Sequence, residues 1–222
     1  MSNGRVWLAV HRERAALVRD LESMTVDLWS TPTACAGWDV HDVVAHLVDS
    51  ARTTRLGFVR DMIAAGFDFD RQNARGVARE RRAEPASTLA ALRAVVTHTS
   101  TPPAPIATRL VEAFVHGEDI RRAIGHTGDY PVAETVQALE FQLRTSVKMG
   151  GGRERAAGLR LIASDAPLDV GGNSPAVRGS ALALLLAVSG RPTRPGELSG
   201  PGTARLTPGS PPGAAPPGSP GG

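Results

Sequence analysis

The stretch from Leu110 to Gly125, LVEAFVHGEDIRRAIG, constrains the fold strongly because it predicts an apolar helix with three ionisable groups on one side. At about 3.6 residues per turn, Glu112 and His116 lie one turn apart, and Asp119 follows on the same side. Such groups are costly to bury unless they pair or bind an ion. A carboxylate and an imidazole at this spacing can bind one metal ion, provided that a third ligand comes from another segment.

The donor of the third ligand is expected to be His46, in the segment WDVHDVVAHLVDS. This segment predicts a helix from residue 40 to about 65, with Asp39 as its N-cap. On its own, a histidine there is more often a hydrogen-bonded core residue than a ligand. Together with Glu112 and His116, it completes a set of three metal ligands.

Three neighbouring residues each have two interpretations. Asp42 is either the acceptor that orients the His46 imidazole or a first-turn acid favoured by the helix dipole. Asp119 can hydrogen-bond Arg122 or a ligand imidazole, and its position on the helix favours the imidazole. Cys35, in the loop before the His46 helix, is either a thiolate ligand or a buried structural cysteine, and the structural role is favoured.

Apolar residues at helical spacing predict a bundle of four long amphipathic helices. We place these helices at residues 3–24, 40–65, 87–99 and 110–125. A charged segment at 67–82 predicts a short helix across the bundle, whose arginines either bind anions or are simply solvated. A further helix follows Pro131. With 41% hydrophobic residues in a chain of 222, there is enough apolar surface for a sizeable core.

The pattern changes after Gly150. The expected elements are strands at 159–163 and 168–170, an apolar helix at 181–188 capped by Ser180, and a last short strand at 200–206. This unit is too small to hold a good core alone, so it is expected to pack on the bundle.

We therefore expect three parts: a metal-binding helical bundle over 1–149, a small α+β unit over 150–206, and a disordered Pro/Gly tail over 207–222. A net charge of +3 and 4% aromatic residues argue against nucleic-acid binding. The chain shows neither a signal peptide nor the roughly 20 apolar residues that span a membrane. We expect a cytoplasmic protein, and its single cysteine excludes an internal disulfide.

The sequence PTACAGWDVHDVVAHLV, followed by VEAFVHGEDIRRAIG, resembles the mycothiol-dependent maleylpyruvate isomerase family, a branch of the DinB-like metal-binding four-helix bundles. The segments GLRLIASDAPLDVGG and AVRGSALALLLAVSGRP resemble the small C-terminal domain of such proteins, so that the resemblance extends from residue 3 to about 206. It implies a mainly α fold, a DinB-like four-helix bundle with a small C-terminal α+β unit. It also implies a divalent metal, usually zinc, bound by His46, Glu112 and His116.

The resemblance further implies a coordination position for the thiol of mycothiol or for water. A metal-bound thiol loses its proton near neutral pH and becomes a nucleophile. In the isomerase, this thiolate adds to the double bond of maleylpyruvate, allows rotation and departs; in a thiol S-transferase, it stays attached to the small electrophilic substrate.

An arginine of the C-terminal domain is expected to bind the substrate carboxylate, and Arg178 and Arg191 are the candidates. Arg109 is the candidate for lining a cavity that binds the thiol cofactor. The alternative function is a non-enzymatic metal-binding or regulatory module, which a closed four-ligand site would favour.

Overall fold

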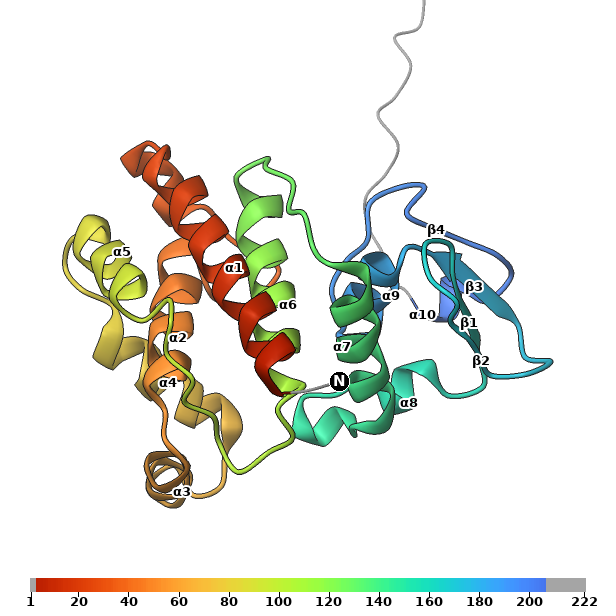
Figure 1. The fold of residues 1–222 in the computed structure, drawn as a ribbon, viewed down its shortest axis with the longest axis horizontal. Coiled ribbons are helices and arrows are strands. Elements are labelled where there is room, and N and C mark those ends of the chain that lie inside the picture. The colour runs from red at the N-terminus through yellow and green to blue at the C-terminus, as the bar shows by residue number, and fades with distance from the viewer. Residues whose placement is uncertain (1–2, 207–222) are drawn as a thin grey trace, which may run out of the picture.

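Four helices form the bundle in the computed structural model, which describes residues 3–206 (Figure 1). They are α1 (Asn3–Glu22), α2 (Val40–Arg52), α5 (Pro85–Ala94) and α6 (Thr108–Ala123). Both α1 and α2 pack against α5 and α6. The predicted four-helix bundle is therefore confirmed. The third predicted helix is shorter than expected, since α5 ends at Ala94 and not at Thr99.

The N-terminus of α2 is fixed by a capping box. The Asp39 carboxylate accepts a hydrogen bond from the Asp42 backbone N–H, and the Asp42 side chain accepts one from the Asp39 N–H. Both carboxylates also pair with Arg81, at 2.8 and 2.7 Å. Asp42 is thus a first-turn acid that caps its own helix, which was one of its two interpretations.

The helix expected over residues 40–65 is wrong in one respect, because it is two helices. The hydroxyl of Thr53 donates to the Asp49 carbonyl, 2.8 Å away, and ends α2. The next residue, Thr54, caps α3 (Arg55–Ala64) by accepting from the Gly57 N–H. Two adjacent threonines offer the backbone a bend in place of a helical turn, because their hydroxyls satisfy groups that the helix would otherwise bond.

The charged segment forms a helix as expected, α4 (Phe69–Glu80), which packs against α2. The close approach depends on Gly76, because a Cβ there would lie 2.3 Å from an Asp49 side-chain oxygen. Arg79 from the same helix pairs with that carboxylate at 2.5 Å. Arg79 and Arg81 of this segment therefore bind acids of the neighbouring helices, and for these two arginines the structure favours pairing over free anion-binding groups.

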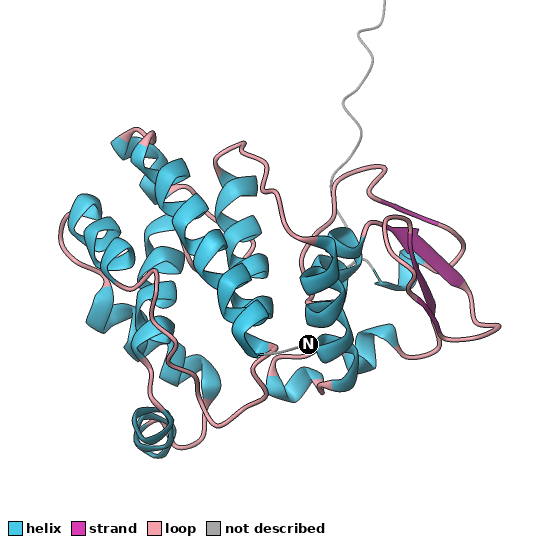
Figure 2. Ribbon diagram, viewed as in Figure 1, coloured by secondary structure: helices cyan, strands magenta, loops and turns pink. Residues whose placement is uncertain are grey.

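The C-terminal half begins with α7 (Val132–Arg144), which packs on α9 (Ala181–Val188) (Figures 1 and 2). Ser180 caps α9 through the Ala183 N–H, as predicted. Short 3-10 helices lie at Val26–Ser30 and Val147–Met149, and α8 (Arg153–Ala156) leads into the sheet.

The sheet has the order β2-β1-β3-β4, with β1 and β3 parallel and both outer pairs antiparallel. Its strands are β1 (Arg160–Ala163), β2 (Asp169–Val170), β3 (Ala176–Gly179) and β4 (Leu198–Ser199). The expected last strand at 200–206 is wrong: this segment holds α10 (Thr203–Leu206), and Gly200 turns the chain with φ of +106°. β3 was not predicted from the sequence.

Two hydrophobic clusters form the core, and α1 and α6 contribute to both. One cluster contains Val10 and Phe114 with residues of α7, α9 and the sheet; the other contains Leu17 and Ile120 with residues of α2 and α5. The first cluster thus joins the bundle to the C-terminal unit, which packs on the bundle as expected. The boundary at residue 150 itself stays a prediction.

No helix within residues 3–206 has the length and apolar character needed to cross a membrane. The expected Pro/Gly tail, residues 207–222, lies outside the described residues.

Candidate metal centre

His46 from α2 and His116 from α6 face each other at the centre of the candidate site. Their ring centroids are 4.9 Å apart in an edge-to-face arrangement, and Trp38 covers His46 at 5.1 Å. The buried Nδ1 of His46 has no hydrogen-bond partner among the described residues. Burial lowers the pKa of His46 to about 4, so this imidazole is neutral near pH 7. A neutral imidazole with a vacant nitrogen is the form that binds a metal ion.

Glu112 lies one turn before His116 and forms a 2.9 Å ion pair with Arg109. Burial alone would raise the pKa of Glu112, but Arg109 and the two nearby imidazoles outweigh it and hold this pKa below its usual value. Glu112 is therefore an ionised carboxylate. Its side chain and that of His116 remain 16% and 17% exposed, so the site is not sealed from solvent.

Arg109 is buried in this structure. Its guanidinium donates to the Ser50 hydroxyl at 2.6 Å besides pairing with Glu112, while its Nε has no partner among the described residues. The observed contacts make Arg109 a partner of the ligand candidate Glu112. Its predicted contact with a thiol cofactor stays a prediction.

Asp119 orients His116. The Nδ1 of His116 lies 3.0 Å from Oδ2 of Asp119, while Arg122 pairs with Glu118 and Glu197 instead. The interpretation that Asp119 bonds an imidazole is therefore confirmed. Burial opposes the charge on His116, but its bonds to Asp119 and Cys35 raise its pKa to about 10. Without a bound metal ion, both ring nitrogens are therefore protonated near pH 7.

Within residues 3–206, the group whose ligand atoms all lie within 4.8 Å of one another is Cys35, His116 and Asp119. This group differs from the predicted set and shares only His116 with it. The loop before α2 does bring Cys35 to the site, with Sγ 3.0 Å from Asp119 Oδ2. However, the guanidinium of Arg191 already lies against the same atoms, 3.2 Å from Sγ and 2.8 Å from Oδ1 of Asp119.

A metal ion bound by Cys35 and Asp119 would have to displace this guanidinium, because Arg191 already neutralises the buried carboxylate. The pKa of Asp119 shows how strongly its neighbours stabilise the buried negative charge. Burial would raise it, but hydrogen bonds and charges from His116 and Arg191 hold it well below its usual range. The chemistry of the donors therefore favours the side of His116 that faces the His46 ring.

The two arginines predicted for the C-terminal unit have different positions. Arg191 reaches the bundle and pairs with Asp119. Arg178 is exposed on β3, in electrostatic range of Asp169. The contact between Arg191 and Asp119 was not predicted, since it joins residues 72 apart in sequence. A signal was available in the sequence, because Ser-Gly-Arg directly after an apolar helix is typical of a helix end that fixes the next residue.

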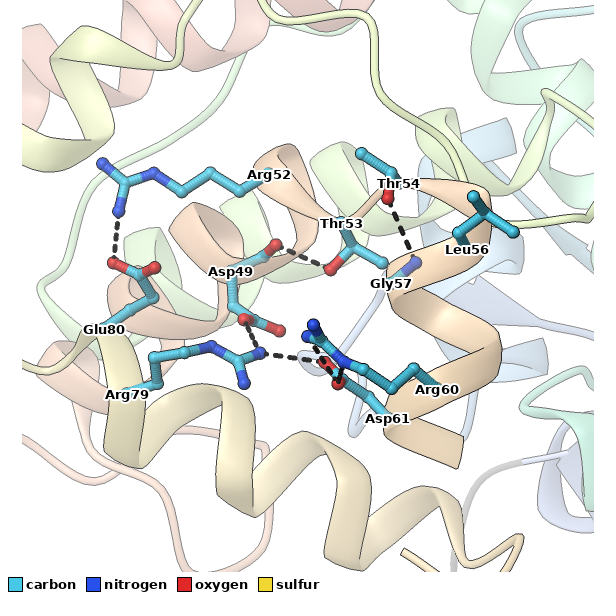
Figure 3. A pocket seen from close by; sticks show the side chains of 10 residues that line it. All are labelled: Asp49, Arg52, Thr53, Thr54, Leu56, Gly57, Arg60, Asp61, Arg79 and Glu80. Atoms are coloured by element: carbon cyan, nitrogen blue, oxygen red, sulfur yellow. Dashed lines mark hydrogen bonds and ion pairs between the residues drawn. The ribbon is translucent and has the colours of Figure 1, made fainter. Parts of the chain in front are cut away.

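A separate pocket of about 500 Å³ lies at the C-terminal end of α2, between α3 and α4 (Figure 3). Its charged side chains pair with one another, for example Arg52 with Glu80 at 2.6 Å and Arg60 with Asp61 at 2.9 Å. Because these charges are already compensated, the pocket offers less to a charged ligand than the centre between α2 and α6 does.

Comparisons with known proteins agree with this architecture. Residues 10–101 match the model of the mycothiol maleylpyruvate isomerase N-terminal domain. The crystal structure of the mycothiol-dependent maleylpyruvate isomerase is similar to this chain, with a TM-score of 0.63 at 15% identity, over 90% of this chain and 93% of that one. A histidine-to-alanine mutant of that enzyme gives the same TM-score and coverage at 14% identity. No curated protein sequence matches the chain significantly.

The matched segment contains the capped helix with His46 and the loop with Cys35, and it ends before Glu112 and His116. The structural similarity covers the remainder, including the small C-terminal unit. Residues 10–101 are thus similar to the N-terminal domain of the mycothiol maleylpyruvate isomerases, and the chain as a whole has the fold of the crystallised isomerase.

Proposed function

We propose that this protein is a divalent-metal-binding, mycothiol-dependent isomerase or thiol S-transferase that acts on small electrophilic substrates. The observation that carries the proposal is the pair of facing imidazoles, His46 and His116, with the ionised Glu112 one turn from His116. A buried imidazole nitrogen without a partner is costly, and a metal ion would remove that cost. The similarity to the isomerase N-terminal domain and to the crystallised isomerase supports mycothiol as the thiol and a small electrophile as the substrate.

The residues that would hold the metal are His46, Glu112 and His116, and zinc suits two imidazoles and one carboxylate. A bound ion of this kind lowers the pKa of a coordinated thiol, so that the thiolate forms near neutral pH.

The protein's own residues prepare the site in three ways. Arg109 keeps Glu112 ionised, Asp119 orients His116, and Trp38 covers the His46 ring. The remaining exposure of Glu112 and His116 keeps both side chains in contact with solvent, from which a thiol would approach. We therefore favour an enzyme over a structural metal module, in which a fourth protein ligand would close the site.

Metal content tests the ligand set. Purified protein is expected to carry close to one equivalent of divalent metal by elemental analysis, and His46→Ala, Glu112→Gln and His116→Ala are each expected to remove it, because too few ligands remain. Cys35→Ser distinguishes the two groups around His116, and this variant is expected to keep the metal. Loss of metal from Cys35→Ser together with retention in Glu112→Gln would place the ion in the Cys35 group and overturn the proposed set.

Activity is tested with metal-loaded protein, mycothiol and a panel of electrophiles that includes maleylpyruvate. Turnover is expected to require both the thiol and Glu112, so that Glu112→Gln is inactive with every substrate. A protein that holds one equivalent of metal but converts no member of the panel would support the alternative, a non-enzymatic metal-binding or regulatory module.

A further inference from the structure

The carboxylate of Asp119 is contacted from both parts of the molecule. Arg191 donates from Nε to Oδ1 at 2.8 Å and from Nη2 to Oδ2 at 3.0 Å, the two-pronged geometry that a guanidinium forms with a carboxylate. On its other side, Oδ2 lies 3.0 Å from Nδ1 of His116. One oxygen atom therefore links an arginine of the C-terminal unit to an imidazole of the bundle.

The backbone of Arg191 is held rigidly. Gly190 ends α9 with φ of +79°, its N–H donates to Ala187, and the Arg191 N–H donates to Leu186 at 2.8 Å. This pattern is a Schellman motif, in which the residue after the glycine has a fixed place. Since α9 is almost entirely buried, the guanidinium of Arg191 extends from a fixed point toward α6.

The carboxylate needs this partner. The side chain of Asp119 is only 1% exposed, so its charge would be costly without a cation nearby. While Asp119 is ionised and held in place, it accepts a hydrogen bond from the Nδ1–H of His116, and the lone pair of the neutral ring is then on Nε2. A metal-ligating histidine commonly has its second nitrogen bonded to a carboxylate in this way, which fixes the tautomer and ring orientation.

We propose that Arg191 is a positioning residue for the metal centre, which holds Asp119 so that His116 keeps the tautomer and orientation needed to bind the ion. The proposal rests on the proposed function in one respect, that His116 is a ligand. Metal affinity then depends on one arginine of the C-terminal unit, although that unit supplies no ligand itself.

The chain contains a matched control for docking. Arg122, one turn after Glu118 on α6, pairs with Glu197 of the C-terminal unit at 2.8 Å. This ion pair also joins the two parts, but neither residue contacts His116 or Asp119 through the hydrogen bonds of the described chain. Glu197→Gln therefore weakens docking and leaves the contacts of Asp119 in place.

The test measures Zn²⁺ affinity by competition with a chelator, on full-length wild type and on Arg191→Gln, Arg191→Lys, Asp119→Asn and Glu197→Gln. Arg191→Gln is expected to bind Zn²⁺ about 10- to 100-fold more weakly, the usual loss when the partner of a ligand is removed. Arg191→Lys should recover part of this loss, because lysine restores the charge but not the two-pronged bond. Combining Arg191→Gln with Asp119→Asn should add little to Asp119→Asn alone, since both act through one contact.

A second readout reports the ligand geometry. The visible spectrum of the Co²⁺-loaded protein is expected to change in Arg191→Gln and to stay as in wild type in Glu197→Gln. Wild type that binds neither ion would refute the proposed function. Wild type that binds Zn²⁺, with equal affinity and an unchanged Co²⁺ spectrum in Arg191→Gln, would refute the positioning role alone. An equal loss of affinity in Glu197→Gln would assign the effect to docking and also overturn it.

Discussion

At the scale of single residues, this protein buries several charged groups and gives each a partner on another element. Arg121, which is 1% exposed, donates to Glu13 of α1 at 2.5 Å and to the Tyr130 hydroxyl at 2.6 Å. Gly117, one turn earlier, leaves room for this arrangement, because a Cβ there would lie 2.5 Å from a Glu13 side-chain oxygen. Removing one member of such a pair leaves a buried charge alone, which costs more than the pair itself contributes.

His41 provides a test of the pH dependence of stability. It is buried, its Nε2 lies 2.7 Å from the Thr88 hydroxyl, and its ring meets Trp29 edge-to-face. Burial, helped by the charge of Arg81, lowers its pKa below that of an exposed histidine. As pH falls through about 6.5, the unfolded chain takes up this proton first, so the free energy of unfolding decreases.

His41→Gln can keep the hydrogen bond to Thr88 but cannot bind the proton. The free energy of unfolding, measured by denaturant titration between about pH 7.5 and 5.5, is therefore expected to fall less steeply in this variant than in wild type. Parallel curves for the two proteins would mean that His41 does not contribute to the pH dependence.

At the scale of elements, the close contact between α2 and α4 depends on Gly76. Gly76→Ala would place a methyl group against the Asp49 carboxylate and disturb its 2.5 Å ion pair with Arg79. Overpacking of this kind costs about 1–3 kcal/mol, and loss of a charged hydrogen bond costs about 1.5–3 kcal/mol. Both exceed what alanine gains over glycine in a helix, about 1 kcal/mol.

We therefore expect Gly76→Ala to lower the melting temperature by several degrees, since about 1 kcal/mol corresponds to roughly 2–4 °C in a protein of this size. In an Asp49→Ser background the same change should cost much less, because the shorter side chain leaves space for the methyl group. A variant with unchanged melting temperature would show that Asp49 can move aside freely.

The elements of the fold were predicted well where a long apolar pattern decides them. α1, α6 and α9 follow their periodicity, and α9 also follows its Ser180 cap, whereas the break at Thr53 and Thr54 depends on hydroxyl contacts that periodicity does not contain. The strand expected at 200–206 was wrong because a glycine with positive φ redirects the chain there.

In the candidate site too, the sequence predicted contacts within one helix but not contacts between distant segments. Spacing along α6 predicted the bond between His116 and Asp119, since these residues share a helix face. It did not predict that Arg191 would reach Asp119, because that contact depends on how two distant segments pack.

At the scale of the whole molecule, α1 and α6 connect two parts of the core. Their N-terminal halves pack with α7, α9 and the sheet, and their C-terminal halves pack with α2 and α5. Neither cluster can lose its packing without exposing apolar surface on these two helices. This arrangement favours cooperative unfolding of the bundle and the C-terminal unit.

We expect one transition in denaturant when unfolding is followed by far-UV circular dichroism and by tryptophan fluorescence. In a Trp7→Phe variant, which lacks the tryptophan packed against the other cluster, Trp29 and Trp38 report on the part of the core around α2, while circular dichroism reports on all helices. Coincident midpoints support a single cooperative unit. A tryptophan transition clearly separate from the circular dichroism transition would show that the two clusters unfold independently.

The sharing of α6 between the two clusters also bears on how such a protein can change in evolution. The helix that carries Glu112 and His116 contributes one half to each cluster, so its apolar residues must pack against two different sets of neighbours. A C-terminal unit taken from a distant relative would have to match the surface of α6 and α7 as well as present an arginine to Asp119. The two units are therefore expected to diverge together, and exchange of either one as an independent module would disturb the site between α2 and α6.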